Sequence, residues 1–219
     1  MSMMGYFLET TPELMTLLKM TPGLVGVVVN LTTSQPQLPF SEKEIEKLPA
    51  EVRENLMQSL KEMDKLTDQM NEEQIAKLKK LAPKDHPYIL AQLKGRQAFS
   101  VDKDWHGIHF VLTGNTPEQK GALGQAVFGG KALGDDLGYG PARLLSPEEV
   151  KKVSNALQSF TDAQFKKGYT QKKMNKQEIY PGGWEMDENY QIALTHFNEL
   201  KAYYKGAADK NQAMLLFVL

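Results

Sequence analysis

Two histidines three residues apart are the first candidates for chemistry in this sequence. His106 and His109 lie in the segment 100–114, which reads SVDKDWHGIHFVLTG. In a helix, residues three apart lie on one side, and two imidazoles there could share a metal ion. In a strand they would point to opposite faces. No third ligand follows at a motif spacing, so a structural histidine pair is favoured and no metal site is predicted.

The periodicity of the same segment favours a helix. Val101, Trp105, Ile108 and Leu112 form a stripe with steps of four, three and four residues. Ser100 or Asp102 could cap this helix, and Gly114 could end it. Gly107 and the β-branched residues are the evidence for a strand. We expect a helix over residues 101–113.

Glycines crowd the following region, between residues 121 and 140. Closely spaced glycines can expose backbone N–H groups to a phosphate, but no Gly-Lys-Ser/Thr follows here. Glu148 and Glu149 at the next helix start would repel an anion. Turns and close backbone approach are therefore favoured. Arg143 is the cation that could still hold an anion in this region.

A second group of chemically interesting residues surrounds the turn Pro181-Gly182-Gly183. Tyr180 and Trp184 flank it, and aromatic rings beside a turn can line a cleft or cover the edge of a core. The base rate favours a trans peptide bond before Pro181.

The composition excludes several classes of protein. The chain has 26 basic and 27 acidic residues, so nucleic acid is not expected as a partner. The absence of cysteine excludes disulfides and thiolate catalysis. No signal peptide and no apolar run of about 20 residues is present, so a soluble, cytoplasmic protein without a membrane partner is expected. One local cluster of lysines is interpreted as a solvated helical face: Lys166, Lys167, Lys172, Lys173 and Lys176.

The elements that position these residues indicate an α+β fold. Strands are predicted at 3–8 and 214–218, and helices that begin at the caps Thr11, Ser146 and Thr161 and at Asp187. The β-branched run 23–31 is expected to be a strand or a buried loop. Residues 41–81 predict a helical hairpin, with breaks at Pro49 and Asn71. We expect one domain over 1–219 with a small mixed sheet that includes both terminal strands, and the helical hairpin inserted at 41–82.

Several sequence motifs resemble the YfbM-like family, bacterial proteins classed as a domain of unknown function. The motifs are MMGYF at 3–7, DKDWHGIHFVLTG at 102–114, AVFGG at 126–130, LGYGPAR at 137–143, SPEEV at 146–150 and EIYPGGW at 178–184. The resemblance implies an α+β fold and no established activity. It also selects the positions of a candidate cleft: His106, His109, Tyr139, Arg143, Tyr180 and Trp184.

Two functional hypotheses follow. The first is a non-catalytic module that binds a small molecule or a protein, because no nucleophile–base or metal motif is present. The second is a small-molecule enzyme in which His106 or His109 acts as acid/base, Arg143 anchors an anion and Tyr180 donates a hydrogen bond. The sequence favours the first, leaves open whether the protein is an enzyme, and predicts no cofactor. The partner is an unidentified protein or small molecule.

Overall fold

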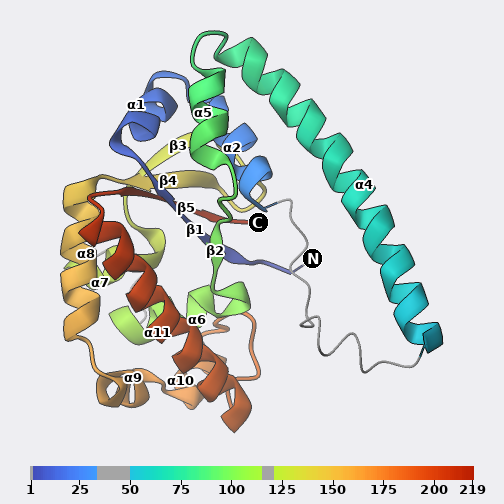
Figure 1. Cartoon of the computed structure of the whole chain (residues 1–219). Coiled ribbons are helices and arrows are strands. Elements are labelled where there is room, and N and C mark those ends of the chain that lie inside the picture. The colour runs from blue at the N-terminus through green and yellow to red at the C-terminus, as the bar shows by residue number, and fades with distance from the viewer. Residues whose placement is uncertain (1, 34–49, 115–120) are drawn as a thin grey trace. The chain divides into compact units, whose positions relative to one another are not determined.

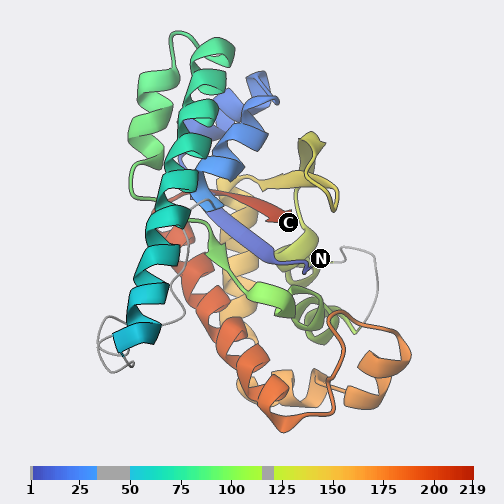
Figure 2. The same cartoon turned by 90° about the vertical axis from the view of Figure 1, so that its right-hand side faces the viewer.

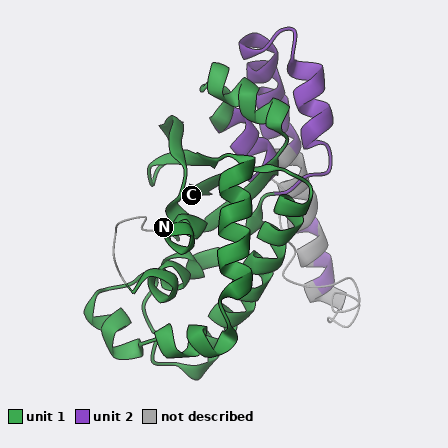
Figure 3. Cartoon of the chain, turned by 90° about the vertical axis from the view of Figure 1, so that its left-hand side faces the viewer, with its two compact units in different colours: residues 1–25, 98–219 green, residues 26–97 purple. Residues whose placement is uncertain are grey.

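The computed structural model describes residues 2–33, 50–114 and 121–219, with the side chains of residues 50–67 described only at 53, 54 and 58. The chain forms two compact units, which Figure 3 shows in different colours. Unit 1 comprises Met1–Val25 and Ala98–Leu219, and unit 2 comprises Gly26–Gln97. Residues 41–49 of the predicted helical hairpin lie outside the described residues.

Unit 1 is built on a sheet that contains both ends of the chain (Figure 1). The strands are β1 (Gly5–Thr10), β2 (Phe99–Ser100), β3 (Lys131–Asp136), β4 (Pro141–Leu145) and β5 (Ala213–Val218), in the order β2-β1-β5-β4-β3. The terminal strands β1 and β5 pair over their whole length, from Gly5 opposite Val218 to Thr10 opposite Ala213. The α+β fold is therefore confirmed. The strand pairings within the described residues are all antiparallel, whereas a mixed sheet was predicted.

Helices pack against this sheet to form the core of unit 1. They are α1 (Pro12–Met20), α6 (Trp105–Thr113), α7 (Gly121–Phe128), α8 (Pro147–Ser159), α9 (Asp162–Gly168), α10 (Gln171–Lys176) and α11 (Asp187–Asp209). Figure 2 shows α8 and α11 running beside the sheet. Buried Leu157 of α8, Phe197 of α11 and Met214 of β5 belong to one apolar cluster. Burial of this cluster is the main stabilising contribution to unit 1.

The predicted helix starts are confirmed where a side chain caps them. The Ser146 hydroxyl accepts a hydrogen bond from the Glu149 N–H, and the Glu149 carboxylate accepts one from the Ser146 N–H. Thr161 and Gln164 form the same reciprocal capping box at α9, and Thr11 caps α1. Each cap stabilises its helix by about 1 kcal/mol because it satisfies N–H groups that lack a partner within the helix.

The segment around Trp105 is helical, as predicted. A short 3₁₀ turn, η1 (Asp102–Asp104), leads into α6, and Gly114 ends α6 in the left-handed conformation with φ +69°. Ser100 accepts a hydrogen bond from the Asp102 N–H at 2.9 Å. The helix offers nearly all its sides to the protein interior, which explains its high apolar content.

The prediction for residues 23–31 is wrong, because they lie in the helix α2 (Leu24–Thr33). β-Branched residues disfavour helices only weakly, by less than about 0.7 kcal/mol each. Val25, Val27, Val28 and Val29 are all buried, so tertiary burial overrides this weak preference.

The glycine-dense region also contains more regular structure than the turns predicted for it. It includes α7 and the β3–β4 hairpin, in which Lys131 pairs with Leu144. Close backbone approach does occur at Gly130, where a side chain would lie 2.4 Å from the Leu144 carbonyl oxygen. The Tyr180–Pro181 peptide bond is cis, contrary to the base-rate expectation.

Unit 2 consists of α2 from Gly26 onward, α4 (Ala50–Leu81) and α5 (His86–Leu93). The predicted break at Asn71 is wrong, because α4 continues through this residue without interruption. A short turn after Leu81 reverses the chain into α5, which returns beside the end of α4 (Figure 1). Within the described residues, no helix is both long and apolar enough to cross a bilayer.

Candidate functional site

Three segments that are far apart in the sequence meet around the ring of Trp105. The indole Nε1–H donates a hydrogen bond to the Met3 carbonyl oxygen at 3.2 Å, and the Tyr180 hydroxyl accepts one from the Met3 N–H at 2.9 Å. The Trp105 ring also stacks on His106 and Tyr180, with centroid distances of 5.1 and 5.9 Å. The chain start, α6 and the Tyr180–Pro181 turn therefore form one aromatic cluster.

His106 belongs to this cluster and connects α6 to the turn. Its Nδ1 accepts a hydrogen bond from the Tyr180 N–H at 3.1 Å, which requires that this nitrogen carry no proton. Burial lowers the pKa of His106 from its ordinary value, because desolvation disfavours the charged ring. Both effects favour a neutral imidazole that holds the turn in place.

His109 and Trp184 lie deeper than His106. His109 is buried and packs edge-on against Phe128, with a centroid distance of 4.8 Å. Trp184 is 1% exposed; its Nε1–H donates to the Ile179 carbonyl oxygen at 2.7 Å, and its ring lies against Gly107. In the described part of the chain, no three His, Asp or Glu side chains are arranged to hold a metal ion.

The other two predicted site residues lie on a different part of unit 1: Arg143 in β4, and Tyr139 between β3 and β4. The Arg143 guanidinium donates to the carbonyl oxygens of Gly129 and Gly130, at 3.2 Å from Nε and 2.8 Å from Nη2. It thereby binds the segment directly after α7, where a cation complements the helix dipole. Tyr139 is 44% exposed, in the turn between β3 and β4.

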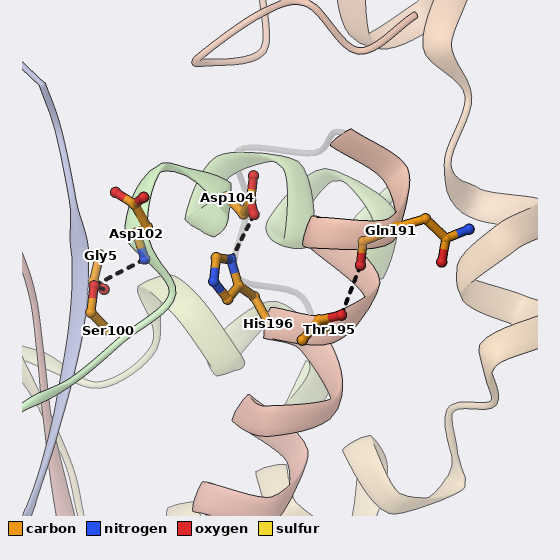
Figure 4. A network of polar contacts seen from close by, with 7 residues as sticks. All are labelled: Gly5, Ser100, Asp102, Asp104, Gln191, Thr195 and His196. Carbon is orange, nitrogen blue, oxygen red and sulfur yellow. Dashed lines mark hydrogen bonds and ion pairs between the residues drawn. The ribbon is translucent and has the colours of Figure 1, made fainter. Parts of the chain in front are cut away.

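One ion pair was not predicted from the sequence. The Nδ1 of His196 in α11 lies 2.7 Å from Oδ2 of Asp104 in η1, and Asp104 is only 8% exposed. The hydrogen bond to Asp104 raises the pKa of His196 above its ordinary value, against the opposing effect of burial. Figure 4 shows the other ring nitrogen of His196 pointing away from Asp104. The two residues are 92 positions apart, so no local pattern could reveal the pair.

The Asp104–His196 pair has one feature of an acid/base dyad, a carboxylate that orients an imidazole. The nearby Ser100 hydroxyl donates to the Gly5 carbonyl oxygen and accepts from the Asp102 N–H. Both of these hydrogen bonds are to the backbone, and neither is to His196. The pair joins η1, and through it α6, to α11.

Burial, with a contribution from the charge of Asp104, also raises the pKa of Tyr169.

Among the cavities lined by residues that the structure describes, three are of interest for their size and position, and each lies within one unit. The first, of about 440 Å³, lies between the carboxyl-terminal half of α6 and the helices α9 and α10. The second, of about 580 Å³, lies beside β3 and the start of α8, and its charged residues are Lys19, Lys131, Lys152, Glu148 and Glu149. The third, of about 400 Å³, is formed by α2, α4 and α5 in unit 2.

The cavity at α6, α9 and α10 combines an apolar base with a basic rim. Phe110, Val111 and Phe160 supply the apolar surface, and Lys167 and Lys173 supply the charge. Gly168 lets the end of α9 approach α6, because a side chain there would lie 3.0 Å from the Val111 Cγ1 and carbonyl oxygen. The two lysines belong to the lysine cluster that was predicted to be a solvated helical face.

Comparison with known proteins identifies the family. The family model described as "Domain of unknown function (DUF1877)" matches residues 1–217. The chain belongs to this family. It is similar to the protein YfbM of Escherichia coli strain K12, with 32% identity over 93 residues, which are 41% of this chain and 55% of YfbM. The aligned part thus spans about half the length of that relative.

A solved structure has the same fold. It is described as the crystal structure of a protein of unknown function, YfbM from Escherichia coli, and the comparison covers 99% of both chains with a TM-score of 0.55 and 20% sequence identity. The predicted resemblance to the YfbM-like family is confirmed.

Proposed function

We propose that this protein is a non-catalytic binding module for a small anionic molecule with an aromatic or other apolar part. The observation that carries the proposal is the cavity between α6, α9 and α10. Its volume of about 440 Å³ lies within the range of about 300–1,000 Å³ that is usual for small-molecule sites. Apolar walls with a few polar groups at the rim are also typical of such sites.

The charged groups of the cavity favour an anion. Lys167 and Lys173 form no ion pair with any residue that the structure describes. Lys166, Lys172 and Lys176 are exposed on the same two helices and add to the positive potential. A concentration of like charge around a cavity attracts ligands of opposite charge.

The apolar part of the ligand is inferred from the base of the cavity. Phe110 and Val111 are buried in the protein but line this cavity, and the Phe160 ring stands at its side. An aromatic ring placed there would remove apolar surface from water, worth about 25 cal/mol per Å². Gln164 and Thr170 provide hydrogen-bonding groups at the rim.

Two observations favour binding over catalysis. The described lining of this cavity contains no carboxylate, imidazole or thiol that could act as a base or nucleophile. The rival hypothesis needs His106 or His109 as acid/base and Arg143 as an anion anchor. Nδ1 of His106 instead accepts from the Tyr180 N–H, and His109 is buried. Nε and Nη2 of Arg143 donate to the Gly129 and Gly130 carbonyl oxygens, which gives Arg143 a role in holding the fold.

Phenyl phosphate is a suitable probe, because it joins an aromatic ring to a dianion. It should be titrated into the isotope-labelled full chain while the backbone amide signals are followed. We expect saturable shifts at Gly114, Gly168 and Thr170, with weaker binding of inorganic phosphate and of phenol. The Lys167→Gln and Lys173→Gln variants should each bind about two- to fivefold more weakly, the effect of one exposed charge pair.

Lys151→Gln is the matched control, since Lys151 is an exposed lysine of α8 that does not line the cavity. It should bind the probe as the wild type does. The proposal fails if no saturable shift occurs at the lining residues, or if both lysine variants bind normally. Release of phenol at a rate proportional to the protein concentration would show catalysis and would also refute it.

A further inference from the structure

We propose a second small-molecule site in unit 2, between α2, α4 and α5, for an aliphatic carboxylic acid that also carries a hydroxyl or amide N–H group. This site has no lining residue in common with the cavity of the proposed function. The two sites can therefore be tested and refuted separately.

The shape and lining of the cavity indicate an aliphatic ligand. Its volume is about 400 Å³, and its apolar walls are Leu31 of α2, Ile75 of α4, and Leu90, Ala91 and Leu93 of α5. No aromatic ring is among the described lining residues, so nothing there would select a flat ligand by stacking. Flexible aliphatic side chains can instead pack around a hydrocarbon chain.

Asn71 supplies the argument for a hydrogen-bond donor. It was predicted to cap a helix, but α4 runs through it, so the side chain has no capping role. It lies one turn before Ile75 on the side of α4 that lines the cavity. Its Oδ1 is buried and has no hydrogen-bond partner among the described residues.

A buried carbonyl oxygen without a hydrogen-bond partner destabilises a fold, and asparagine is also a poor residue for a helix interior. We therefore expect the Asn71→Leu variant to be more stable than the wild type. A ligand that donates a hydrogen bond to Oδ1 would remove this destabilisation. The unsatisfied acceptor in an apolar cavity is therefore what indicates a ligand with a donor group.

Lys94 supplies the argument for a carboxylate. Asn71 lies ten residues before the end of α4, about 15 Å, and Lys94 lies eight residues after the start of α5, about 12 Å. Because the chain reverses between α4 and α5, these similar lengths bring Asn71 and Lys94, the C-cap residue of α5, to similar heights along the two helices. Both line the cavity. The Lys94 ammonium forms no ion pair with a described residue, so it can receive an acid group at the rim.

The test compares β-hydroxyoctanoate with octanoate and with the methyl ester of β-hydroxyoctanoate, by calorimetry and by amide shifts of the full chain. We expect β-hydroxyoctanoate to bind about tenfold more tightly than octanoate, because octanoate leaves Oδ1 without a donor. The ester should bind about two- to fivefold more weakly than the acid, because it lacks the charge that Lys94 attracts.

The Asn71→Leu variant gives the sharper result. It removes the unsatisfied acceptor at nearly constant side-chain size. The tenfold preference for β-hydroxyoctanoate over octanoate should therefore disappear, while the chain stays folded. Lys94→Gln should abolish the difference between acid and ester. Lys84→Gln is the matched control, because Lys84 is exposed in the turn before α5 and does not line the cavity.

Two measurements on the Asn71→Leu variant report whether it is folded: its melting temperature relative to the wild type, and its binding of phenyl phosphate at the cavity of unit 1. Three results would overturn the inference: no saturable binding of either acid by wild type, shifts that fall outside α2, α4 and α5, or a preference for the hydroxy acid that persists in Asn71→Leu. A failure of phenyl phosphate binding alone would concern only the proposed function.

Discussion

Gly107 determines how closely α6 can pack against the turn that carries Trp184, and Gly107→Ala tests this packing. A methyl group built on Gly107 would lie 2.4 Å from Cη2 of Trp184 and 2.9 Å from Cζ2 and Cζ3. Carbon atoms in favourable contact lie about 3.5–4.0 Å apart. The indole has little room to move, because it is 1% exposed and its Nε1–H is bonded to the Ile179 carbonyl oxygen.

The size of the effect follows from two opposing contributions. Alanine is a better helix former than glycine by about 0.8–1.0 kcal/mol, which should stabilise the variant. Overpacking of a filled core costs about 1–3 kcal/mol. Gly206→Ala isolates the first contribution, since Gly206 lies within α11 and an added methyl group would contact nothing within 4 Å. We expect Gly107→Ala to be less stable than Gly206→Ala by about 1–3 kcal/mol.

Equilibrium unfolding in urea measures this difference, with both variants and the wild type at one pH. The fluorescence of the two tryptophans, one of which is Trp184, should change together with the circular dichroism if unfolding is two-state. If Gly107→Ala proved as stable as Gly206→Ala, the close packing of α6 on Trp184 would be wrong.

Two further predictions concern contacts of the same region. The pKa of His196 is raised in the folded chain, so its pair with Asp104 should stabilise the protein fully below about pH 6.5 and lose this effect as the pH rises through the folded pKa. The difference in unfolding free energy between wild type and His196→Gln should therefore shrink in alkaline urea titrations; a constant difference would contradict the ion pair. Tyr180→Phe should cost about 1 kcal/mol in the same assay, because the Met3 N–H loses its acceptor, whereas Tyr139→Phe at an exposed tyrosine should be neutral.

Much of the fold could be predicted from the sequence where the signal is local. The capping boxes at Ser146 and Thr161 depend on residues three positions apart, so the sequence contains the whole interaction. The helix after Asp104 could be predicted for a related reason, since its apolar stripe and Gly114 lie within one short segment. The terminal strands were recognisable from their apolar runs, although their pairing with each other was an inference from fold rules.

The candidate site was predictable only in part. The motifs selected His106 and Tyr180, and the structure places these two in contact. The sequence could not show that Arg143 binds backbone carbonyl groups, because main-chain acceptors leave no trace in residue types. It also gave no sign that Lys167 and Lys173 border a cavity, since the base of that cavity comes from another helix.

The sequence by itself determined where the capped helices α1, α8 and α9 begin, which segments are apolar and which chemistries are excluded by the lack of cysteine. Only the tertiary structure decided the helical state of the valine-rich α2, the continuation of α4 through Asn71 and the pairing of Asp104 with His196. The physical reason is the relative size of two contributions to the free energy of folding, local conformational preference and burial of apolar side chains. Local preferences amount to a few tenths of a kcal/mol per residue, whereas burial of a single large apolar side chain contributes about 1.5–3 kcal/mol and depends on residues distant in the chain.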